Sequence, residues 1–360
     1  MDGFDAASGE RVFESRVFES RVFESRVFES RVFESRVFES NGSESGFLDM
    51  TEFLINWLAN APGTAAPYAF AALGLIISER SGVLNLTAEG LMLVGAVAGL
   101  GASLMLGGHP LIALLIAMLS ASLVSLLFAG LVVILRVNQV IAGLSIVFFC
   151  QGLTGLIGTL ANWQNHPIIG LSKIAIWPLS EIPFVGRILF VQDPIVYFAI
   201  PIFFGVSLFL QKSMLGLKLR AVGENPAAAD AAGINVSLYR IGAIVAGSSL
   251  VGLAGGYISV VSVKLWVTGM VGGRGWIAVA LVVFARWAPW PALAGALLFG
   301  CIEGVVPRIA AAGISVPQYL MLMTPYIATI AVMMWVGARN RGYLGEPGAL
   351  GQPHVREERR

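Results

Sequence analysis

The hydrophobic and polar positions of this chain are grouped on the scale of whole membrane spans. No Asp, Glu, Lys or Arg occurs from Gly90 to Leu135, and about 20 apolar residues are enough to cross a bilayer as a helix. The sequence Gly-Gly-His-Pro at 107–110 predicts a turn inside this run. The whole pattern predicts spans near 62–78, 83–106, 110–135, 140–161, 194–211, 240–263, 275–287, 290–307 and 317–337.

The first span and the pair that meets around 286–289 are short for full crossings. We therefore expect an all-α integral membrane protein with about eight or nine transmembrane helices and a broken or short first pair. The predicted transmembrane domain covers 61–340, and 341–360 follow it as a cytosolic tail. Residues 47–60 mix acidic side chains with Phe53, Leu54 and Trp57, which is typical of a helix lying along the membrane interface.

The first 46 residues form a low-complexity tail. Residues 11–40 are six perfect copies of Arg-Val-Phe-Glu-Ser. A five-residue period winds Val and Phe around every face of a helix, and it puts them on alternate sides of a strand. Because no continuous apolar face results, we predict that 1–46 are disordered and lie outside the fold.

Composition and charge exclude several classes of protein. Hydrophobic residues make up 56% of the 360 positions and charged residues 12%, whereas a soluble domain carries roughly 25% charged residues. A net charge of +1 gives no electrostatic footprint for nucleic acid. Cys150 and Cys301 lie far apart in apolar runs and indicate no disulfide framework. The main body is therefore neither a water-soluble enzyme nor a nucleic-acid-binding protein.

Enzymatic chemistry is also missing from the sequence. There is no Gly-x-x-x-x-Gly-Lys-Ser/Thr phosphate loop, so we expect no ATP hydrolysis and no cofactor in this chain. His109, His166 and His354 have no metal-ligand spacing. No Ser/His or paired-acid arrangement falls within a span.

The distribution of basic residues predicts the orientation, because cytosolic loops are enriched in Lys and Arg. Alternating nine spans puts twelve basic residues on one side, among them Arg80, Arg136, Arg240 and Arg286, and five on the other, among them Arg274. This places the 212–240 loop and the C-terminus in the cytosol.

The 212–240 loop contains a short, capped helix. Asn225 is a suitable N-cap, Pro226 suits the first helical position and Gly233 suits the stop. The helix is too short to span a membrane, and its alanines, Ala229 among them, leave a face nearly bare of side chains. The spacing leaves two interpretations open: docking into a partner's groove, or a plain surface helix.

Two polar stretches lie at or near membrane depth. The first, 78–90, carries Asn85 and Glu89 next to glycine, and the second opens a span with Asn138 and Gln139. Polar groups at this depth are costly and often functional, since broken helices line aqueous cavities in transporters. These four residues are candidates for a transport pathway. Turn formation, helix capping and helix–helix hydrogen bonds are the structural alternatives.

Four motifs in these regions resemble the permease subunits of bacterial ATP-binding-cassette importers, in the branch that serves nucleosides and simple sugars within the branched-chain amino acid and ribose-type superfamily. They are Ser-Glu-Arg-Ser-Gly-Val-Leu-Asn-Leu-Thr-Ala-Glu-Gly at 78–90, Asn-Gln-Val-Ile-Ala-Gly at 138–143, Ala-Val-Gly-Glu-Asn-Pro-Ala-Ala-Ala-Asp-Ala-Ala-Gly-Ile at 221–234, and Gly-Gly-Arg-Gly-Trp-Ile-Ala-Val-Ala-Leu at 272–281. The resemblance covers about 60–340.

The resemblance implies a type II importer-like fold in a multi-pass protein of the bacterial plasma (inner) membrane. It identifies a cytosolic coupling helix that docks on an ATPase, and the residues of this segment are Gly223, Glu224, Asn225, Pro226, Ala229 and Gly233. ATP and Mg would bind to that ATPase. The other implied partners are a second, different permease subunit and an extracytoplasmic solute-binding (lipo)protein.

The expected solute is neutral, because the spans carry no clustered charge. The Asn-Leu-Thr-Ala-Glu-Gly form resembles the nucleoside branch more than the ribose branch. A nucleoside or nucleobase is therefore the first expectation and a simple sugar the alternative. An ion-coupled secondary transporter is a further alternative, but it would need intramembrane acids for which only Glu89 and Glu303 are available.

Overall fold

The computed structural model describes residues 44–182, 184–311 and 345–353, together with positions 323, 327, 330, 331 and 334. Most of the predicted tail 1–46, most of the ninth predicted span at 317–337 and parts of the tail 341–360 lie outside the described residues. Residues 1–54 and 55–360 form two separate units. The described part of the first unit is the beginning of helix α2, and the second unit contains the rest of the described residues.

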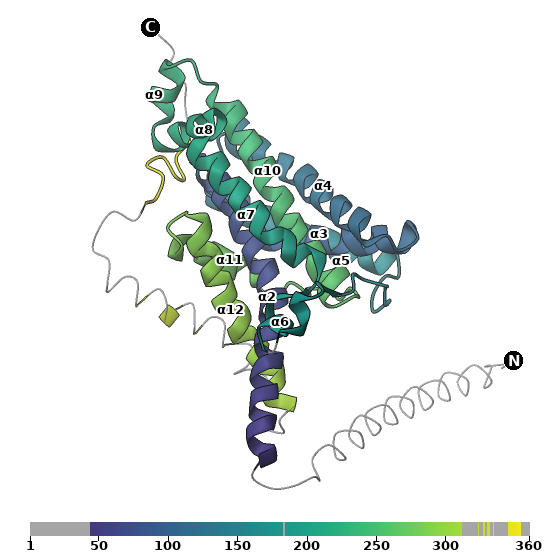
Figure 1. Ribbon diagram of the computed structural model, residues 1–360. Helices are drawn as coiled ribbons and strands as arrows, with labels where there is room; N and C mark the ends of the chain where they lie inside the picture. The colour runs from purple at the N-terminus through teal and green to yellow at the C-terminus, as the bar shows by residue number, and fades with distance from the viewer. Residues whose placement is uncertain are drawn as a thin grey trace, which may run out of the picture. The chain divides into compact units, whose positions relative to one another are not determined.

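The described residues are almost entirely helical (Figure 1). The long helices are α2 (Glu44–Glu79), α3 (Ala88–Met105), α4 (Pro110–Ala129), α5 (Gln139–Leu160), α7 (Pro194–Lys212), α10 (Val236–Tyr257) and α12 (Pro289–Ala311). Shorter helices are α6 (Val185–Leu189), α8 (Met214–Glu224), α9 (Pro226–Ala231), α11 (Arg274–Phe284) and the 3₁₀-helix η2 (Leu179–Glu181). Two π-helical turns, η1 (Gly130–Ile134) and η3 (Ile258–Ser262), extend α4 and α10. Strands β1 (Ile174–Ala175) and β2 (Val191–Gln192) pair antiparallel.

Six of these helices are long and apolar enough to cross a membrane: Glu52–Glu79, Ala88–Met105, Pro110–Ile134, Gln139–Leu160, Pro194–Lys212 and Val236–Ser262. Two shorter apolar helices follow, Arg274–Phe284 and Pro289–Val305. The all-α membrane fold predicted from the sequence is thereby confirmed. Since α2 is continuous from Glu44, residues 47–60 belong to the same helix as the first span. Their place at a membrane interface stays a prediction.

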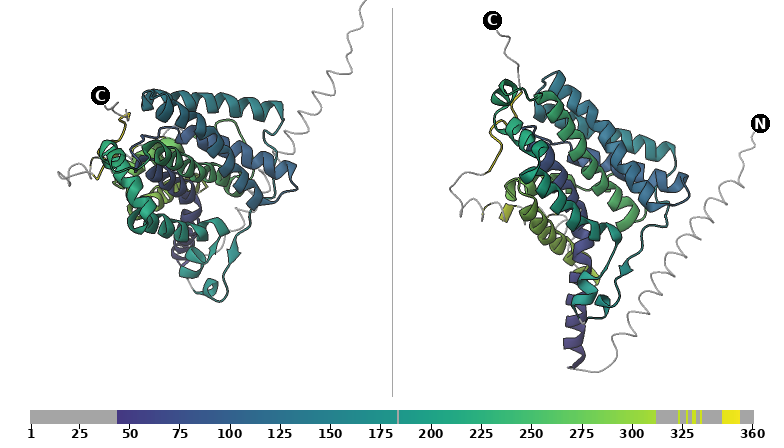
Figure 2. Two further views of the ribbon diagram at one scale, coloured as in Figure 1. Left: turned by 90° about the horizontal axis from the view of Figure 1, so that it is seen from above. Right: turned by 45° about the horizontal axis from the view of Figure 1, so that its top comes forward.

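The helices in the centre of the second unit pack closely against one another at glycine positions. Helix α10 packs along α2, α3 and α4 (Figures 1 and 2). A Cβ on Gly247 would lie 2.3 Å from the carbonyl oxygen of Gly74, and one on Gly95 would lie 2.2 Å from that of Gly252. Small residues allow such backbone approach in membrane proteins, where lipid gives no hydrophobic drive for helices to associate.

The connection between α2 and α3 is the break that the sequence predicts in the first pair of transmembrane helices. Residues 83–87 are neither helix nor strand, yet Val83, Asn85 and Thr87 are fully buried. Gly90 packs on residues 147–150 of α5, so the first turn of α3 lies about 12–16 Å along α5 from its start. Helix α3 therefore begins inside the bundle rather than at its end. Non-helical backbone at this depth is tolerated only where protein buries it or water reaches it.

Candidate functional site

The predicted coupling helix forms as its local sequence requires. The Asn225 side chain accepts a 3.0 Å hydrogen bond from the backbone N–H of Ala228, and Pro226 occupies the first helical position. Gly233 has a φ of +80°, which suits glycine at the end of a helix, and the N–H of Ile234 returns to the carbonyl oxygen of Ala229 at 3.0 Å. The result is α9, Pro226–Ala231, joined directly to α8.

One residue of this helix faces the opposite way from the expectation. Ala229 is buried and forms a small apolar cluster with Val222 and Val236. The placement of Ala229 on the outward small face is therefore wrong, because the helix must bury one side to remain attached to α8 and α10. The exposed small side chains of this segment are Ala227, Ala228, Ala231 and Ala232.

Gly223 connects the end of α8 to the rest of the bundle, and Glu224 Oε2 accepts a 3.2 Å hydrogen bond from the N–H of Gly348. A Cβ on Gly223 would lie 2.2 Å from the carbonyl oxygen of Arg80, so the end of α8 lies directly against the turn that follows α2. Arg80 in turn donates from Nε to the carbonyl oxygen of Trp287 at 3.1 Å, and Trp287 donates from Nε1 to Glu79 at 2.5 Å. The turns after α2, α8 and α11 thus meet at one end of the bundle.

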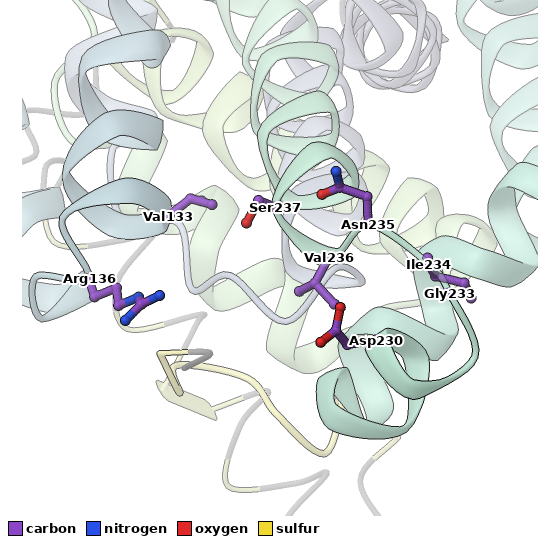
Figure 3. Close-up of a pocket in the computed structure, with 8 residues that line it drawn as sticks. All are labelled: Val133, Arg136, Asp230, Gly233, Ile234, Asn235, Val236 and Ser237. Carbon is purple, nitrogen blue, oxygen red and sulfur yellow. The ribbon is translucent and has the colours of Figure 1, made fainter. Parts of the chain in front are cut away.

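A cavity of about 300 Å³ opens beside the coupling helix (Figure 3). Arg136, after η1, and Asp230, on α9, belong to its wall, and the link from α9 to α10 and the start of α10 supply most of the remainder. Its lining residues are Val133, Arg136, Asp230, Gly233, Ile234, Asn235, Val236 and Ser237. The α9 region therefore has an exposed alanine, Ala228, and a cavity on its surface.

Asn85 belongs to the non-helical segment and Gln139 is hydrogen-bonded to it, whereas Asn138 lies at the exposed start of α5. Asn85 is fully buried; its Oδ1 accepts from the N–H of Thr87 at 3.1 Å and its Nδ2 donates to Ser78. Gln139 Oε1 accepts from the N–H of Leu84 at 2.6 Å, while its Nε2 is buried with no partner in the described part of the chain. Asn138 is exposed and caps α5.

Glu89 joins two helix beginnings. It lies in the first turn of α3, and its two carboxylate oxygens accept 2.8 Å hydrogen bonds from the backbone N–H groups of Gly273 and Gly275. These glycines flank the first residue of α11. A carboxylate at a helix N-terminus is favourable because it meets unsatisfied N–H groups and the positive end of the helix dipole.

A polar cluster next to Glu89 was not singled out by the sequence analysis. Arg274 binds Glu303 with 3.1 Å (Nε) and 2.5 Å (Nη2) contacts to Oε1, and the Tyr68 hydroxyl donates to Oε2 at 2.7 Å. The Arg274 and Glu303 side chains are 28% and 25% exposed. The sequence signal was the Gly-Gly-Arg-Gly motif itself, a lone Arg framed by glycines before an apolar helix.

The position of Arg274 corrects its assignment to an outer loop. Gly275 contacts Glu89, and Trp287 contacts Glu79 at the end of α2. Since α11 and its following turn separate these two contacts, Arg274 lies about 15 Å from that end of the bundle. Span counting placed it outside because it assumed that every helix crosses completely.

A family model described as "Branched-chain amino acid transport system / permease component" matches residues 58–335. The chain belongs to this permease family.

Three relatives refine the placement of the permease. It is 37% identical to a putative glucose ABC transporter permease protein, TsgC13 of Haloferax volcanii, over 83% of this chain and 98% of the relative. It is 34% identical to the guanosine ABC transporter permease NupQ of Bacillus subtilis, over 82% and 95%. Identity to the nucleoside ABC transporter permease NupC of Lactococcus lactis is 32%, over 77% and 90%. No solved structure matches the permease.

These findings confirm the resemblance inferred from the four motifs. The permease is a membrane-embedded ABC transport subunit rather than an enzyme, and it is a multi-pass protein of the plasma membrane. Family membership implies an ATPase and a solute-binding protein as partners in general. Membership of an ABC permease family excludes the alternative of an ion-coupled secondary transporter.

Proposed function

We propose that this permease forms the translocation pathway of an importer for a neutral nucleoside or nucleobase, with a simple sugar as the second candidate. ATP and Mg bind to a separate cytosolic ATPase, and this chain holds no cofactor. A second, different permease subunit completes the pathway, and an extracytoplasmic binding protein, in many such systems a lipoprotein, delivers the solute.

The exposed small face of α9 carries this proposal. Ala229 packs against Val222 and Val236 on the buried side of α9. The side chains of Ala227, Ala228 and Ala231 are therefore exposed, and each is only a methyl group. A face of methyl groups lets a partner's backbone approach closely. Gly223, near the end of the adjoining α8, packs on the turn after α2, so the coupling helix lies next to the bundle.

The pathway is proposed to run past Glu89, Asn85, Gln139 and Asn138, along the non-helical segment. Two features support this placement. Helices α3 and α11 both begin inside the bundle at Glu89, an arrangement that marks solute sites in other transporters with discontinuous helices. The partly exposed Arg274 lies beside it and is paired with Glu303, so the region offers hydrogen bonds while its positive charge is not available to a phosphate. A polyhydroxylated neutral solute suits such a region better than a phosphorylated one.

Docking of α9 is tested by a matched pair of tryptophan variants. Ala228→Trp puts a large ring on the outward face without entering the core, whereas Met214→Trp changes a 73% exposed side chain on α8. We expect Ala228→Trp to insert normally yet lose co-purification with the ATPase, and Met214→Trp to retain it. Normal ATPase binding and uptake by Ala228→Trp would make α9 a plain surface helix.

The pathway is tested by thiol accessibility. Single cysteines at Asn85, Glu89 and Gln139, in a background without Cys150 and Cys301, should react with small water-soluble thiol reagents in at least one transport state. Protection of all three in every state, with uptake intact, would assign these residues to helix packing.

The solute class is tested by uptake in cells that lack their own nucleoside and glucose importers and express the complete transporter. Labelled guanosine uptake that unlabelled nucleosides inhibit and glucose does not is the expected result. The reverse pattern would select the sugar branch.

A further inference from the structure

The C-terminal residues 345–353, called the strap below, lie across the point where the coupling helix meets the bundle. The N–H of Ala349 donates to the carbonyl oxygen of Gly223 at 2.9 Å, and the N–H of Gly348 donates to Glu224 Oε2 at 3.2 Å. Ala349 is only 4% exposed. The strap is thus bonded to the last two residues of α8, immediately before α9.

The same strap contacts the turn after α2. A Cβ on Gly82 would lie 3.3 Å from both the Ala349 carbonyl oxygen and the Gly223 Cα, so three chain segments converge within van der Waals contact there. Arg80 Nη1 reaches the carbonyl oxygen of Gly345 at 3.5 Å. Because the non-helical segment begins directly after Gly82, the strap contacts both the end of α8 and the turn that leads into the predicted pathway.

A buried arginine fixes the far end of the strap. Arg240, on α10, is 2% exposed, and its Nη1 donates to the carbonyl oxygen of Gln352 at 3.1 Å. Its Nε and Nη2 have no partner among the described residues. Without the strap, this guanidinium would keep none of the hydrogen bonds that the structure gives it, and a buried charge in that state is costly.

We propose that the strap is a positioning element of the coupling machinery: it clasps the end of α8 to the turn at 80–82, so that α9 and the non-helical segment move together. This inference rests on the proposed docking of α9 on an ATPase. Without the strap, α9 can still bind the ATPase, but the displacement of α9 no longer moves residues 83–87.

Two truncations of the complete transporter provide the matched test. Deleting 345–360 removes the strap, whereas deleting 354–360 removes only the residues beyond it. Each is combined with Leu86→Cys in a background without Cys150 and Cys301, and the labelling rate by a water-soluble maleimide is compared with and without ATP plus orthovanadate.

We expect ATP and vanadate to change the labelling rate about fivefold or more in the full chain and after deletion of 354–360, a range usual for coupled sites. After deletion of 345–360 the change should disappear while the ATPase still co-purifies. A preserved change, or loss of ATPase binding, would overturn the positioning role. The positioning role would also be overturned if the labelling rate of Leu86→Cys in the full-length chain did not change with ATP and vanadate.

Point variants keep the proposal testable if the long truncation does not accumulate in membranes. Ala349→Trp should displace the strap because Ala349 is only 4% exposed and its backbone contacts Gly82 and Gly223, and it should abolish the ATP-dependent labelling change. Ala349→Ser, of nearly the same volume, should preserve it. The docking of α9 is refuted by a different result, namely an Ala228→Trp variant that retains the ATPase. A failure of the docking proposal and a failure of the strap proposal are therefore distinguishable.

Discussion

A methyl group added at Gly247 should separate α10 from α2. Its ideal Cβ lies 2.3 Å from both the Gly74 carbonyl oxygen and the Ser78 hydroxyl, more than 1 Å short of the 3.4 Å at which ordinary contact begins. The carbonyl cannot rotate away because it belongs to the α2 backbone. Gly242 lies on the same helix with nothing within 4 Å of its Cβ position, which makes it a matched control.

Overpacking of this kind costs about 1–3 kcal/mol, and at the backbone-to-backbone contact of Gly247→Ala we expect the upper half of that range. Gly242→Ala should be neutral or slightly stabilising, since alanine is favoured over glycine in a helix by about 0.5–1 kcal/mol.

The assay is the thermal midpoint of the detergent-purified permease, followed by the loss of its monodisperse size-exclusion peak. A shift of about 2–4 °C for each kcal/mol is expected. Equal midpoints for Gly247→Ala and Gly242→Ala would refute the reasoning, because the two differ only in the space around the added methyl group.

Four further outcomes follow from the structure. Arg274→Ala should lower the thermal midpoint by the equivalent of about 1–3 kcal/mol, because Glu303 loses its cation, and the double variant with Glu303→Ala should recover part of it. Glu89→Ala should destabilise the protein by about 2 kcal/mol through two lost charge-assisted hydrogen bonds, and Glu89→Gln by less; equal midpoints would contradict the capping role. Ala229→Trp should lower the midpoint, unlike Ala228→Trp, because it overfills the cluster under α9. Deleting 11–40 should leave insertion and uptake near wild type, and a loss of assembly would show that the repeat takes part in the fold.

The coupling helix shows how much local sequence can determine. Its N-cap at Asn225, its first-turn Pro226 and its stop at Gly233 each act on the backbone within a few residues, so spacing alone located α9. The direction of Ala229 was not predictable in the same way. Four of the six positions of the helix are alanine, and no apolar stripe marks which side the bundle covers.

Counting uncharged stretches located the long helices but not the depth of α11, because such stretches report only compatibility with a bilayer. Uncharged stretches report what a bilayer tolerates, and they located the long helices of the described chain correctly. They do not report how far a helix penetrates. Helix α11 begins inside the bundle because Glu89 satisfies its N-terminus, and Glu89 lies about 185 positions earlier in the chain.

By itself, the sequence determined the membrane class, the long apolar helices, the caps of α9, and the family through four local motifs. The tertiary structure alone brought Arg274 to Glu303 and Tyr68, and it alone placed the strap on Gly223 and Arg240. These contacts join positions far apart in the chain, and several end on backbone oxygens, which every residue type carries. Such contacts leave no signature in residue identity, so only the packed chain could decide them.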